Sequence, residues 1–359
     1  MTTIRRMTVR AGPLKSLIWI GRGVIAEAAS LLESPSGRFF LVAPSGAAAA
    51  AGRVREALSG RLLGEFALDD REEAKTLATV ERVADAALGA GIRRDDAVLA
   101  VGGGVTSDVA GFAAAILLRG VTWNAIPTTT AAMADAAVGG KTGVDHARGK
   151  NLLGAFHPPA VILVDTATLD TLPDREHRSG LVEAFKAAWV ADEKLAAQAE
   201  RRLDAVLARK ERAVAALLSG ALRIKARIVG SDPRDAGARR LLNFGHTLGH
   251  AFEAAGGYTH LRHGEAVAWG IAGALELSTA RAGLSAPDAE SIRSVLGRLG
   301  PFPQPDRSPE VLRPFLRRDK KATSAGLPGV LLEAIGRGRI EAGIGEDEWL
   351  EAAARARIG

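Results

Sequence analysis

The chain has 359 residues, enough for two domains of ordinary size, and its 47 Lys and Arg against 41 Asp and Glu give a formal charge of +6. Its hydrophobic and charged fractions, 47% and 25%, are those of a globular protein, which excludes disorder and fibrous structure. The absence of cysteine excludes disulfides, thiolate nucleophiles and Cys-ligated zinc, so any metal ion must be held by nitrogen and oxygen ligands.

The modest basic excess fits an anionic small-molecule substrate at least as well as a polynucleotide. Aromatic residues make up only 4% of the chain and offer few surfaces on which bases can stack, so we expect no nucleic-acid partner. No segment approaches the ~18–20 apolar residues that cross a bilayer. The first ten residues lack the apolar stretch of a signal peptide. We therefore expect a cytoplasmic protein with no membrane partner.

The first half of the chain alternates short apolar runs with helical patterns. Continuous apolar runs of four or five residues are typical of strands buried on both faces, as in parallel sheets. The runs span residues 39–42, 97–101 and 160–164, and helical patterns span 71–88 and 109–118. This alternation predicts an α/β, Rossmann-like N-terminal domain with a parallel sheet over residues 1–175.

The composition changes after Pro173. The following segment is rich in Ala, Leu, Glu and Arg and nearly free of β-branched runs, and Gly256-Gly257 and the Pro-rich stretch 301–305 interrupt its helical patterns. We expect an all-α C-terminal domain over residues 176–359.

A glycine-rich turn, Gly102-Gly-Gly-Val-Thr-Ser-Asp108, directly follows the apolar run that ends at Val101. Glycines let a backbone approach a ligand closely, and the start of the next helix offers N–H groups to a phosphate. The turn departs from the dinucleotide fingerprint G-x-G-x-x-G, because Ser107 stands in place of its third glycine. By itself it indicates either nucleotide binding or a plain tight turn.

A second glycine segment, Val138-Gly-Gly-Lys-Thr-Gly143, resembles a P-loop. A P-loop would need glycine at position 135, where the chain has Asp135, so the segment does not indicate an ATPase. It places Lys141 near Asp135 and shortly before Lys150-Asn151. A solvated polar loop is the alternative interpretation.

Four of the chain's seven histidines fall within 18 residues, and we consider His246, His250 and His263 among them as candidate ligands. The first two are spaced i, i+4 and share one face of a predicted helix, a common geometry for metal ligands. Buried, hydrogen-bonded histidines are the alternative. The spacing does not decide whether Glu183, Glu253 or Glu265 provides a further ligand.

Scattered cations elsewhere are, taken singly, ordinary surface charges. Such residues include Arg119, Lys225, Arg239 and Lys320.

Taken together, these motifs resemble the 3-dehydroquinate synthase family of the sugar phosphate cyclase superfamily. The shared motifs occur in order from about residue 72 to residue 321. They are Gly-Gly-Gly-Val-x-x-Asp108, Leu-Arg119-Gly, Pro127-Thr-Thr, Asp135 with Gly-Gly-Lys141-Thr-Gly, Gly-Lys150-Asn151, Gly154-Ala-Phe, Glu183-x-x-Lys186, Asn243-x-Gly-His246-Thr-x-Gly-His250, His263-Gly-Glu and Asp319-Lys-Lys.

The resemblance implies an enzyme of the shikimate pathway that converts 3-deoxy-D-arabino-heptulosonate 7-phosphate into 3-dehydroquinate and phosphate. In that family the reaction proceeds by transient oxidation with NAD, elimination of phosphate, re-reduction and an intramolecular aldol closure. The implied cofactors are NAD and a divalent metal ion, usually Zn²⁺ with Co²⁺ as an alternative. The family also suggests a homodimer.

Residue roles follow from the same resemblance. It assigns the metal ion to Glu183, His246 and His263 and makes His250 a proton-transfer group instead of a ligand. The residues that it places around the substrate are Arg119, Asp135, Lys141, Asn151, Lys186, Lys225, Arg239, Asn243 and Lys320. The residues that it places around NAD are Glu72, Lys75, Gly103, Gly104, Val105, Asp108, Thr128, Thr129, Lys141, Lys150 and Thr171.

Three alternatives remain at this point. Another sugar phosphate cyclase would share the metal ligands and the NAD loop and act on a different sugar phosphate. A metal-dependent polyol dehydrogenase of the same architecture would release NADH. A non-enzymatic metal-binding protein would show no response to ligands.

Overall fold

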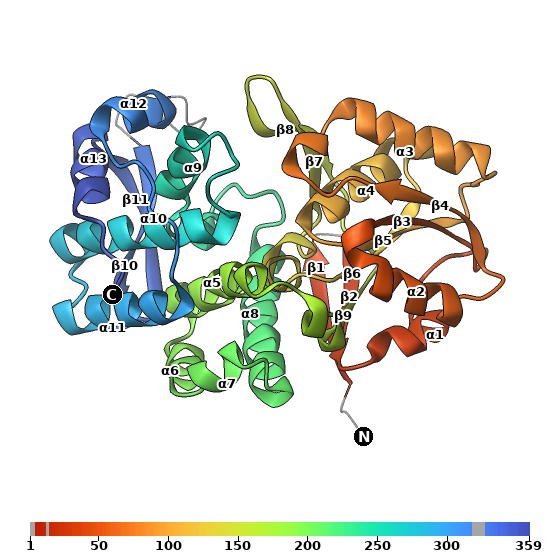
Figure 1. Cartoon of the computed structure of the whole chain (residues 1–359), viewed down its shortest axis with the longest axis horizontal. Coiled ribbons are helices and arrows are strands. Elements are labelled where there is room, and N and C mark those ends of the chain that lie inside the picture. The colour runs from red at the N-terminus through yellow and green to blue at the C-terminus, as the bar shows by residue number, and fades with distance from the viewer. Residues whose placement is uncertain (1–3, 12–13, 318–326) are drawn as a thin grey trace. The chain divides into compact units, whose positions relative to one another are not determined.

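The computed structural model describes residues 4–11, 14–317 and 327–359 (Figure 1). The chain forms two compact units. Unit 1 comprises Met1–Pro173 together with Lys225–Arg234, and unit 2 comprises Asp174–Ile224 together with Asp235–Gly359.

Unit 1 is built on a seven-stranded sheet in the order β1-β2-β9-β6-β5-β3-β4. The strands are β1 (Arg5–Ala11), β2 (Leu14–Gly21), β3 (Phe39–Pro44), β4 (Leu62–Leu68), β5 (Ala97–Gly102), β6 (Thr122–Pro127) and β9 (Val161–Asp165). Only the β1–β2 pair is antiparallel, and all other pairs are parallel. The structure thus confirms the parallel-rich α/β domain, and β3, β5 and β9 occupy the three predicted apolar runs.

Helices and a hairpin complete unit 1. The hairpin consists of β7 (Lys141–His146) and β8 (Gly149–Phe156). The helices are α1 (Ala28–Leu31), α2 (Ala48–Ala57), α3 (Leu77–Gly89) and α4 (Gly104–Ile116), with short helical segments η1 (Val24–Glu27), η2 (Ser45–Ala47), η3 (Glu72–Ala74), η4 (Leu117–Arg119), η5 (Ala132–Ala136) and η6 (Thr166–Thr171). The helix predicted from residue 71 begins later, at Leu77, because Thr76 caps it: Thr76 Oγ1 accepts a 3.2 Å hydrogen bond from Thr79 N.

Both faces of the sheet are covered. Phe39 and Leu41 of β3 belong to a core cluster with apolar residues of α1 and α2. Phe40 alternates with them and therefore points to the other face. On that face, a Cβ on Gly64 would lie 3.1 Å from Ala90 Cβ, just after α3, and 3.5 Å from Phe40 Cε2. Burial on both faces explains why these strands are continuous apolar runs.

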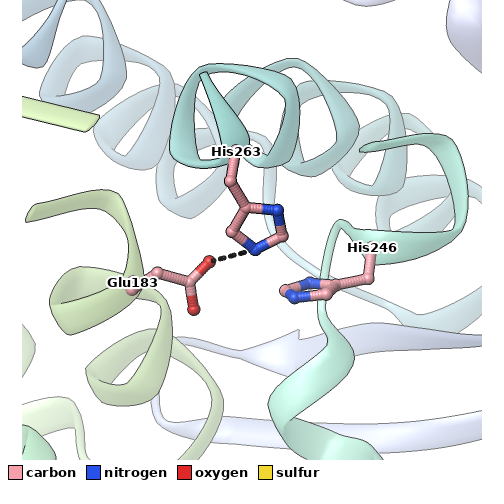
Figure 2. Close-up of side chains that lie close together, drawn as sticks. All are labelled: Glu183, His246 and His263. Carbon is pink, nitrogen blue, oxygen red and sulfur yellow. Dashed lines mark ion pairs between the residues drawn. The ribbon is translucent and has the colours of Figure 1, made fainter. Parts of the chain in front are cut away.

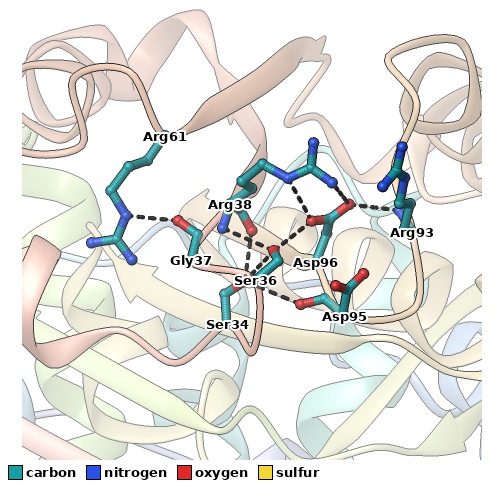
Figure 3. Close-up of polar contacts among 8 residues, drawn as sticks. All are labelled: Ser34, Ser36, Gly37, Arg38, Arg61, Arg93, Asp95 and Asp96. Carbon is teal, nitrogen blue, oxygen red and sulfur yellow. Dashed lines mark hydrogen bonds and ion pairs between the residues drawn. The ribbon is translucent and has the colours of Figure 1, made fainter.

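A buried carboxylate joins the amino ends of β3 and β5 (Figure 3). Asp96 accepts hydrogen bonds from Ser36 Oγ at 2.5 Å, from Arg93 N at 2.7 Å and from the Arg38 guanidinium at 3.0 and 3.1 Å. Burial alone would raise the pKa of Asp96, but these hydrogen bonds and the Arg38 charge lower the pKa overall. Ligands of parallel α/β sheets bind at the opposite, carboxyl ends of the strands, so we assign this network to stability.

Unit 2 is mainly helical, as the sequence predicts. Its helices are α5 (Asp174–Ala191), α6 (Glu193–Arg201), α7 (Leu203–Leu207), α8 (Glu211–Ser231, as far as Ile224), α9 (His246–Ala255), α10 (His263–Leu277), α11 (Ala286–Leu299), α12 (Pro309–Arg317) and α13 (Glu346–Arg355), with η7 (Ala238–Asn243) and η8 (Ser278–Ala282). Helix α10 is buried nearly all round, which is typical of a helix at the centre of a helical domain.

Unit 2 requires one correction to the expectation of an all-α domain. The antiparallel strands β10 (Leu327–Ala334) and β11 (Arg337–Ile344) form a hairpin within it. A two-residue turn joins them, and Gly336 in this turn has a φ of +83°, which favours glycine. The short sequence between Leu327 and Ile344 contains three further glycines, which obscure its alternating pattern.

No helix among the described residues has both the length and the apolar character that crossing a membrane requires.

Candidate functional site

Three side chains from different helices of unit 2 converge (Figure 2). Glu183 comes from α5, His246 from the first residue of α9, and His263 from the first residue of α10. Each offers one potential metal-ligand atom, and these atoms all lie within 4.8 Å of one another. A single ion bound about 2 Å from each atom fits such a group.

Close helix packing brings these residues together. The Gly264 N–H, next to His263, donates a 3.1 Å hydrogen bond to Ser179 Oγ. Ser179 lies one turn before Glu183 on α5, so this contact places Glu183 beside His263. Gly245, the N-cap of α9, has a φ of 79°, and a Cβ there would lie 2.5 Å from Ile271 Cγ1 of α10.

The carboxylate of Glu183 has the environment of a ligand. The residue is only 4% exposed, and neither of its oxygens accepts a hydrogen bond of ordinary geometry from the described residues. Lys186 Nζ forms an ion pair with Oε2 at 2.5 Å, and His263 Nε2 lies 3.6 Å from Oε1. Burying a carboxylate is costly unless its charge is compensated, so a second cation beside Glu183 would be stabilising.

The two imidazoles are oriented as metal ligands would be. His246 Nδ1 lies 3.3 Å from the Phe244 carbonyl oxygen, and His263 Nδ1 lies 3.3 Å from Glu253 Oε2. If these nitrogens donate, each Nε2 keeps a lone pair for a metal ion. Burial, followed by the charge of Lys186, lowers the pKa of His246 well below its ordinary value, so its imidazole is neutral and able to coordinate.

The structure distinguishes the residues that can bind one metal ion together from the other candidates that sequence spacing suggested. His250 is exposed, and its ring centroid lies 5.2 Å from that of His246 and 6.3 Å from that of His263, outside the group of converging ligand atoms. Glu265 is bound by Arg175, with Nε–Oε1 at 2.6 Å and Nη2–Oε2 at 2.7 Å, and it accepts a hydrogen bond from Arg262 N at the start of α10. Glu265 therefore stabilises the helix start.

The other predicted substrate residues of unit 2 lie near these helices in sequence. Arg239 and Asn243 belong to η7, three residues before α9, and Arg239 is 4% exposed. Lys186, 2% exposed, is held by its ion pair with Glu183. Lys320 lies outside the described residues.

In unit 1, the glycine-rich turn follows β5 at the carboxyl edge of the sheet, where open α/β sheets bind ligands. A Cβ on Gly102 would lie 2.3 Å from Thr106 Oγ1, so this position requires glycine. The Thr128 N–H donates to the Gly102 carbonyl oxygen at 2.9 Å and thereby joins the turns that follow β5 and β6. The predicted NAD residues in these two turns are Gly103, Gly104, Val105, Asp108, Thr128 and Thr129, and Thr171 ends η6.

Four predicted NAD residues form two ion pairs. Lys75 Nζ lies 2.6 Å from Asp108 Oδ2, and Lys150 Nζ lies 2.9 Å from Glu72 Oε1. Burial opposes the charge of Lys75, but Asp108 and Glu72 outweigh this effect and raise its pKa. Lys75 is therefore a cation at neutral pH although it is only 4% exposed.

Two of the predicted substrate residues of unit 1 also form an ion pair with each other. Lys225 Nζ lies 2.6 Å from Asp135 Oδ1 and also donates to the Asp135 carbonyl oxygen. Lys141 is exposed at the first position of β7. Arg119 and Asn151 have φ values of +67° and +54°, a left-handed conformation that is uncommon outside glycine and is concentrated at functional sites.

Asp145 is a residue of this region that the sequence analysis missed. Its Oδ1 accepts a 2.8 Å hydrogen bond from Asn151 N, while Lys75 Nζ donates to Asn151 Oδ1 at 2.5 Å. The Asp145 N–H also donates to the Lys75 carbonyl oxygen at 2.9 Å. These contacts hold Asn151 at both its backbone and its side chain. One of these contacts crosses the β7–β8 hairpin, and the other two reach Lys75, about 70 residues earlier in the chain, so no spacing rule indicates them.

Two protein-family models match consecutive parts of the chain. The family models described as 3-dehydroquinate synthase N-terminal and C-terminal match residues 65–179 and 180–322. The 3-dehydroquinate synthase of Solibacter usitatus is 41% identical over 336 residues, which cover 93% of this chain and 94% of that protein.

Two of the solved structures that share the fold are synthases that form cyclic products. One is 2-deoxy-scyllo-inosose synthase complexed with carbaglucose-6-phosphate, NAD⁺ and Co²⁺, with a TM-score of 0.87 and 23% identity over 98% of this chain and 100% of that chain. The other is 2-epi-5-epi-valiolone synthase from Streptomyces hygroscopicus subsp. jinggangensis with NAD⁺ and Zn²⁺ bound. It has a TM-score of 0.83 and 29% identity over 98% of both chains.

The fold is therefore that of the dehydroquinate-synthase-like class of proteins. Within that class, the chain belongs to the 3-dehydroquinate synthase family. It is accordingly an enzyme, and the family's reaction is a phosphate-eliminating cyclisation.

Proposed function

We propose that this chain converts 3-deoxy-D-arabino-heptulosonate 7-phosphate into 3-dehydroquinate and inorganic phosphate. The observation that carries the proposal is the convergence of Glu183, His246 and His263 within 4.8 Å in a chain of this family. One carboxylate and two imidazoles leave coordination positions open for a substrate, as catalytic metal sites do.

The proposed cofactors are NAD and a divalent metal ion, Zn²⁺ or Co²⁺. The two structural neighbours, which were solved with NAD⁺ and Co²⁺ or with NAD⁺ and Zn²⁺, support this choice. A site of one carboxylate and two imidazoles accepts either metal. When bound, NAD supplies a reversible hydride acceptor, and the metal ion acidifies the substrate hydroxyls that it coordinates.

We assign His250 the role of a proton-transfer group. It is exposed, its ring lies 5.2 Å from that of His246, and the ligand group does not include it. An imidazole ordinarily titrates near neutral pH, so it can both accept and return a proton in one catalytic cycle. We assign it the proton of the substrate hydroxyl that is oxidised.

The remaining polar residues bind the anionic substrate. Arginine suits a carboxylate or phosphate because its guanidinium donates two parallel hydrogen bonds, and lysine adds a compact charge. Neutralising the substrate's charges holds it in one orientation and favours the departure of phosphate. The residues that we assign to substrate are Lys186, Arg239 and Asn243 in unit 2, Arg119, Asp135, Lys141, Asn151 and Lys225 in unit 1, and Lys320.

For NAD, we assign the two turns that follow β5 and β6 and the neighbouring ion-paired residues Glu72, Lys75 and Lys150. The start of α4 after β5 offers backbone N–H groups and the positive end of a helix dipole to a diphosphate. The assigned residues are Glu72, Lys75, Gly103, Gly104, Val105, Asp108, Thr128, Thr129, Lys141, Lys150 and Thr171. On this assignment residues 1–175 bind NAD and residues 176–359 bind the metal ion and part of the substrate.

The test is incubation of the purified chain with the heptulosonate phosphate, NAD and Zn²⁺. Phosphate and the carbocyclic product should form in equal amounts, chelation should stop both, and added Zn²⁺ should restore both. Glu183→Gln is the matched inactive variant. No phosphate release from the wild-type chain would overturn the proposal.

A cyclase for another sugar phosphate is the second candidate, because the two structural neighbours are named for other cyclic products. Parallel assays with heptulose 7-phosphate and glucose 6-phosphate decide between the two. Activity on either of these, without activity on the heptulosonate phosphate, favours the second candidate.

We further propose that the chain is a cytoplasmic homodimer, in keeping with its family. Light scattering during size-exclusion chromatography measures the assembly, and cell fractionation tests the location. A mass near 37.4 kDa for the purified protein would contradict the dimer.

A further inference from the structure

A buried carboxylate that the proposed function does not use lies against the metal-ligand group. Glu253, on α9, is 4% exposed. Its Oε2 lies 3.3 Å from His263 Nδ1, while Nε2 of the same ring lies 3.6 Å from Glu183 Oε1. One imidazole thus has a carboxylate at each of its two nitrogens.

We propose that Glu253 is a positioning residue that orients His263 for metal binding. It accepts the Nδ1 proton and so selects the tautomer whose Nε2 lone pair points to Glu183 and His246. This inference rests on the proposed metal site.

The exposure of His263 gives Glu253 this importance. The His263 side chain is 44% exposed and stands at the first residue of α10, so packing restrains its ring less than it restrains the ring of His246. His246 differs, because the residue is 8% exposed and its Nδ1 faces the backbone carbonyl oxygen of Phe244. The contact with Glu253 therefore orients the ring of His263, as burial and the Phe244 carbonyl oxygen orient the ring of His246.

The charge of Glu253 adds to its effect on orientation. Lys186, 2.5 Å from Glu183, already offsets that carboxylate, and two neutral imidazoles add no charge. A second buried carboxylate at the back of His263 makes the imidazole a stronger electron donor and attracts a divalent cation.

Two substitutions of Glu253 separate its effect on the orientation of the His263 ring from the effect of its negative charge. Glu253→Ala removes both, whereas Glu253→Gln keeps an oxygen that can accept the Nδ1 proton and removes the charge. Glu276→Ala is the control: Glu276 lies on α10, as His263 does, and pairs with Arg293 at 2.6 Å, but it is about 20 Å from His263 along the helix.

The measurement is the affinity for Zn²⁺ or Co²⁺, determined by competition with a chromophoric chelator, with the Co²⁺ absorption spectrum as a probe of ligand geometry. We expect Glu253→Ala to weaken affinity about 10- to 100-fold, Glu253→Gln to weaken it less, and Glu276→Ala to match the wild type. Wild-type affinity and spectrum in Glu253→Ala would overturn the inference and leave the metal site intact. A wild-type chain that binds no metal would overturn both the inference and the proposed site.

A second measurement needs no substitution and so does not depend on the variants folding. Nitrogen-15 NMR of the metal-free wild-type protein reports which ring nitrogen of His263 carries the proton. We expect the Nδ1–H tautomer. The Nε2–H tautomer would contradict the role of Glu253.

Discussion

Gly264 packs so closely on Ser179 that a Cβ atom on Gly264 would lie 1.9 Å from the Ser179 carbonyl oxygen. The contact joins the first turn of α10, which starts at His263, to the turn of α5 that precedes Glu183. The distance between two of the three candidate ligands therefore depends on the absence of a side chain at position 264.

Gly264→Ala should separate α5 from α10 and weaken metal binding. Overpacking of this kind costs about 1–3 kcal/mol of unfolding free energy, and the shift of His263 should lower affinity for Zn²⁺ as well. Urea unfolding and chelator competition measure the two effects.

Gly52→Ala is the control for this substitution. Gly52 lies in α2, and a Cβ there would meet nothing within 4 Å. This control should stabilise the chain by up to about 1 kcal/mol, because alanine favours a helix. Equal effects of Gly264→Ala and Gly52→Ala on the free energy of unfolding and on Zn²⁺ affinity would contradict the role of close packing at Gly264.

Substitution of His250 and of His263 should have different consequences. His250→Ala should retain the metal ion and lose turnover by about 10²- to 10⁴-fold, because it removes only a proton-transfer group. His263→Ala should lose both metal and turnover. Metal content and kcat measured on the same preparations distinguish these outcomes. A metal-free His250→Ala beside a metal-loaded His263→Ala would reverse the two roles.

Lys141→Ala should weaken substrate binding about 10- to 100-fold, the loss expected for a charge-assisted hydrogen bond, and should weaken NAD affinity much less, because we assign the Lys141 charge mainly to the anionic substrate. Arg148→Ala is the matched control, since Arg148 is an exposed cation at the tip of the same β7–β8 hairpin. Calorimetric titration with each ligand measures both affinities. Equal loss of substrate and NAD affinity in Lys141→Ala would contradict the assignment of Lys141 mainly to substrate.

Asp96→Asn should destabilise the chain in a pH-dependent way. The folded-state pKa of Asp96 lies below its ordinary value, so the charged carboxylate contributes stability above about pH 3.9, the unfolded value, and this contribution is lost as the pH falls through the folded pKa. We expect Asp96→Asn to cost about 2–3 kcal/mol at neutral pH, because it weakens several hydrogen bonds to a buried charge.

The difference between Asp96→Asn and wild type should shrink in acid. Urea midpoints at neutral pH and below about pH 4 measure it, with Asp95→Asn, at the exposed neighbouring residue, as control. A difference that stays constant across this range would contradict the assignment of the effect to the Asp96 charge.

Much of the fold was predictable because its signals are local. Continuous apolar runs at β3, β5 and β9 indicated a parallel sheet, since strands covered on both faces have no polar side. The hairpin β10–β11 was not predicted, because its glycines interrupt the alternation of apolar and polar residues that identifies strands. Gly336 could have indicated the turn between the two strands.

The candidate site was predictable only in part. The spacing of His246 and His250 indicated a shared helix face, but the structure places His250 outside the group of converging ligand atoms. The partner that completes this group, Glu183, comes from a helix about 60 residues earlier. Spacing is a local signal and does not report such a contact, and the same holds for Glu253 behind His263 and for Asp145 beside Asn151. The resemblance to a family supplied the ligand set.

The most direct test of the account is the number of phosphate ions released for each NAD molecule. The chain, loaded with Zn²⁺ and one equivalent of NAD, is given excess heptulosonate phosphate while phosphate and the absorbance of NADH are followed together. A cyclase that oxidises and then reduces the same substrate should release many phosphate ions per NAD with no accumulation of NADH. NADH that accumulates in proportion to the substrate consumed would contradict the account and identify a dehydrogenase.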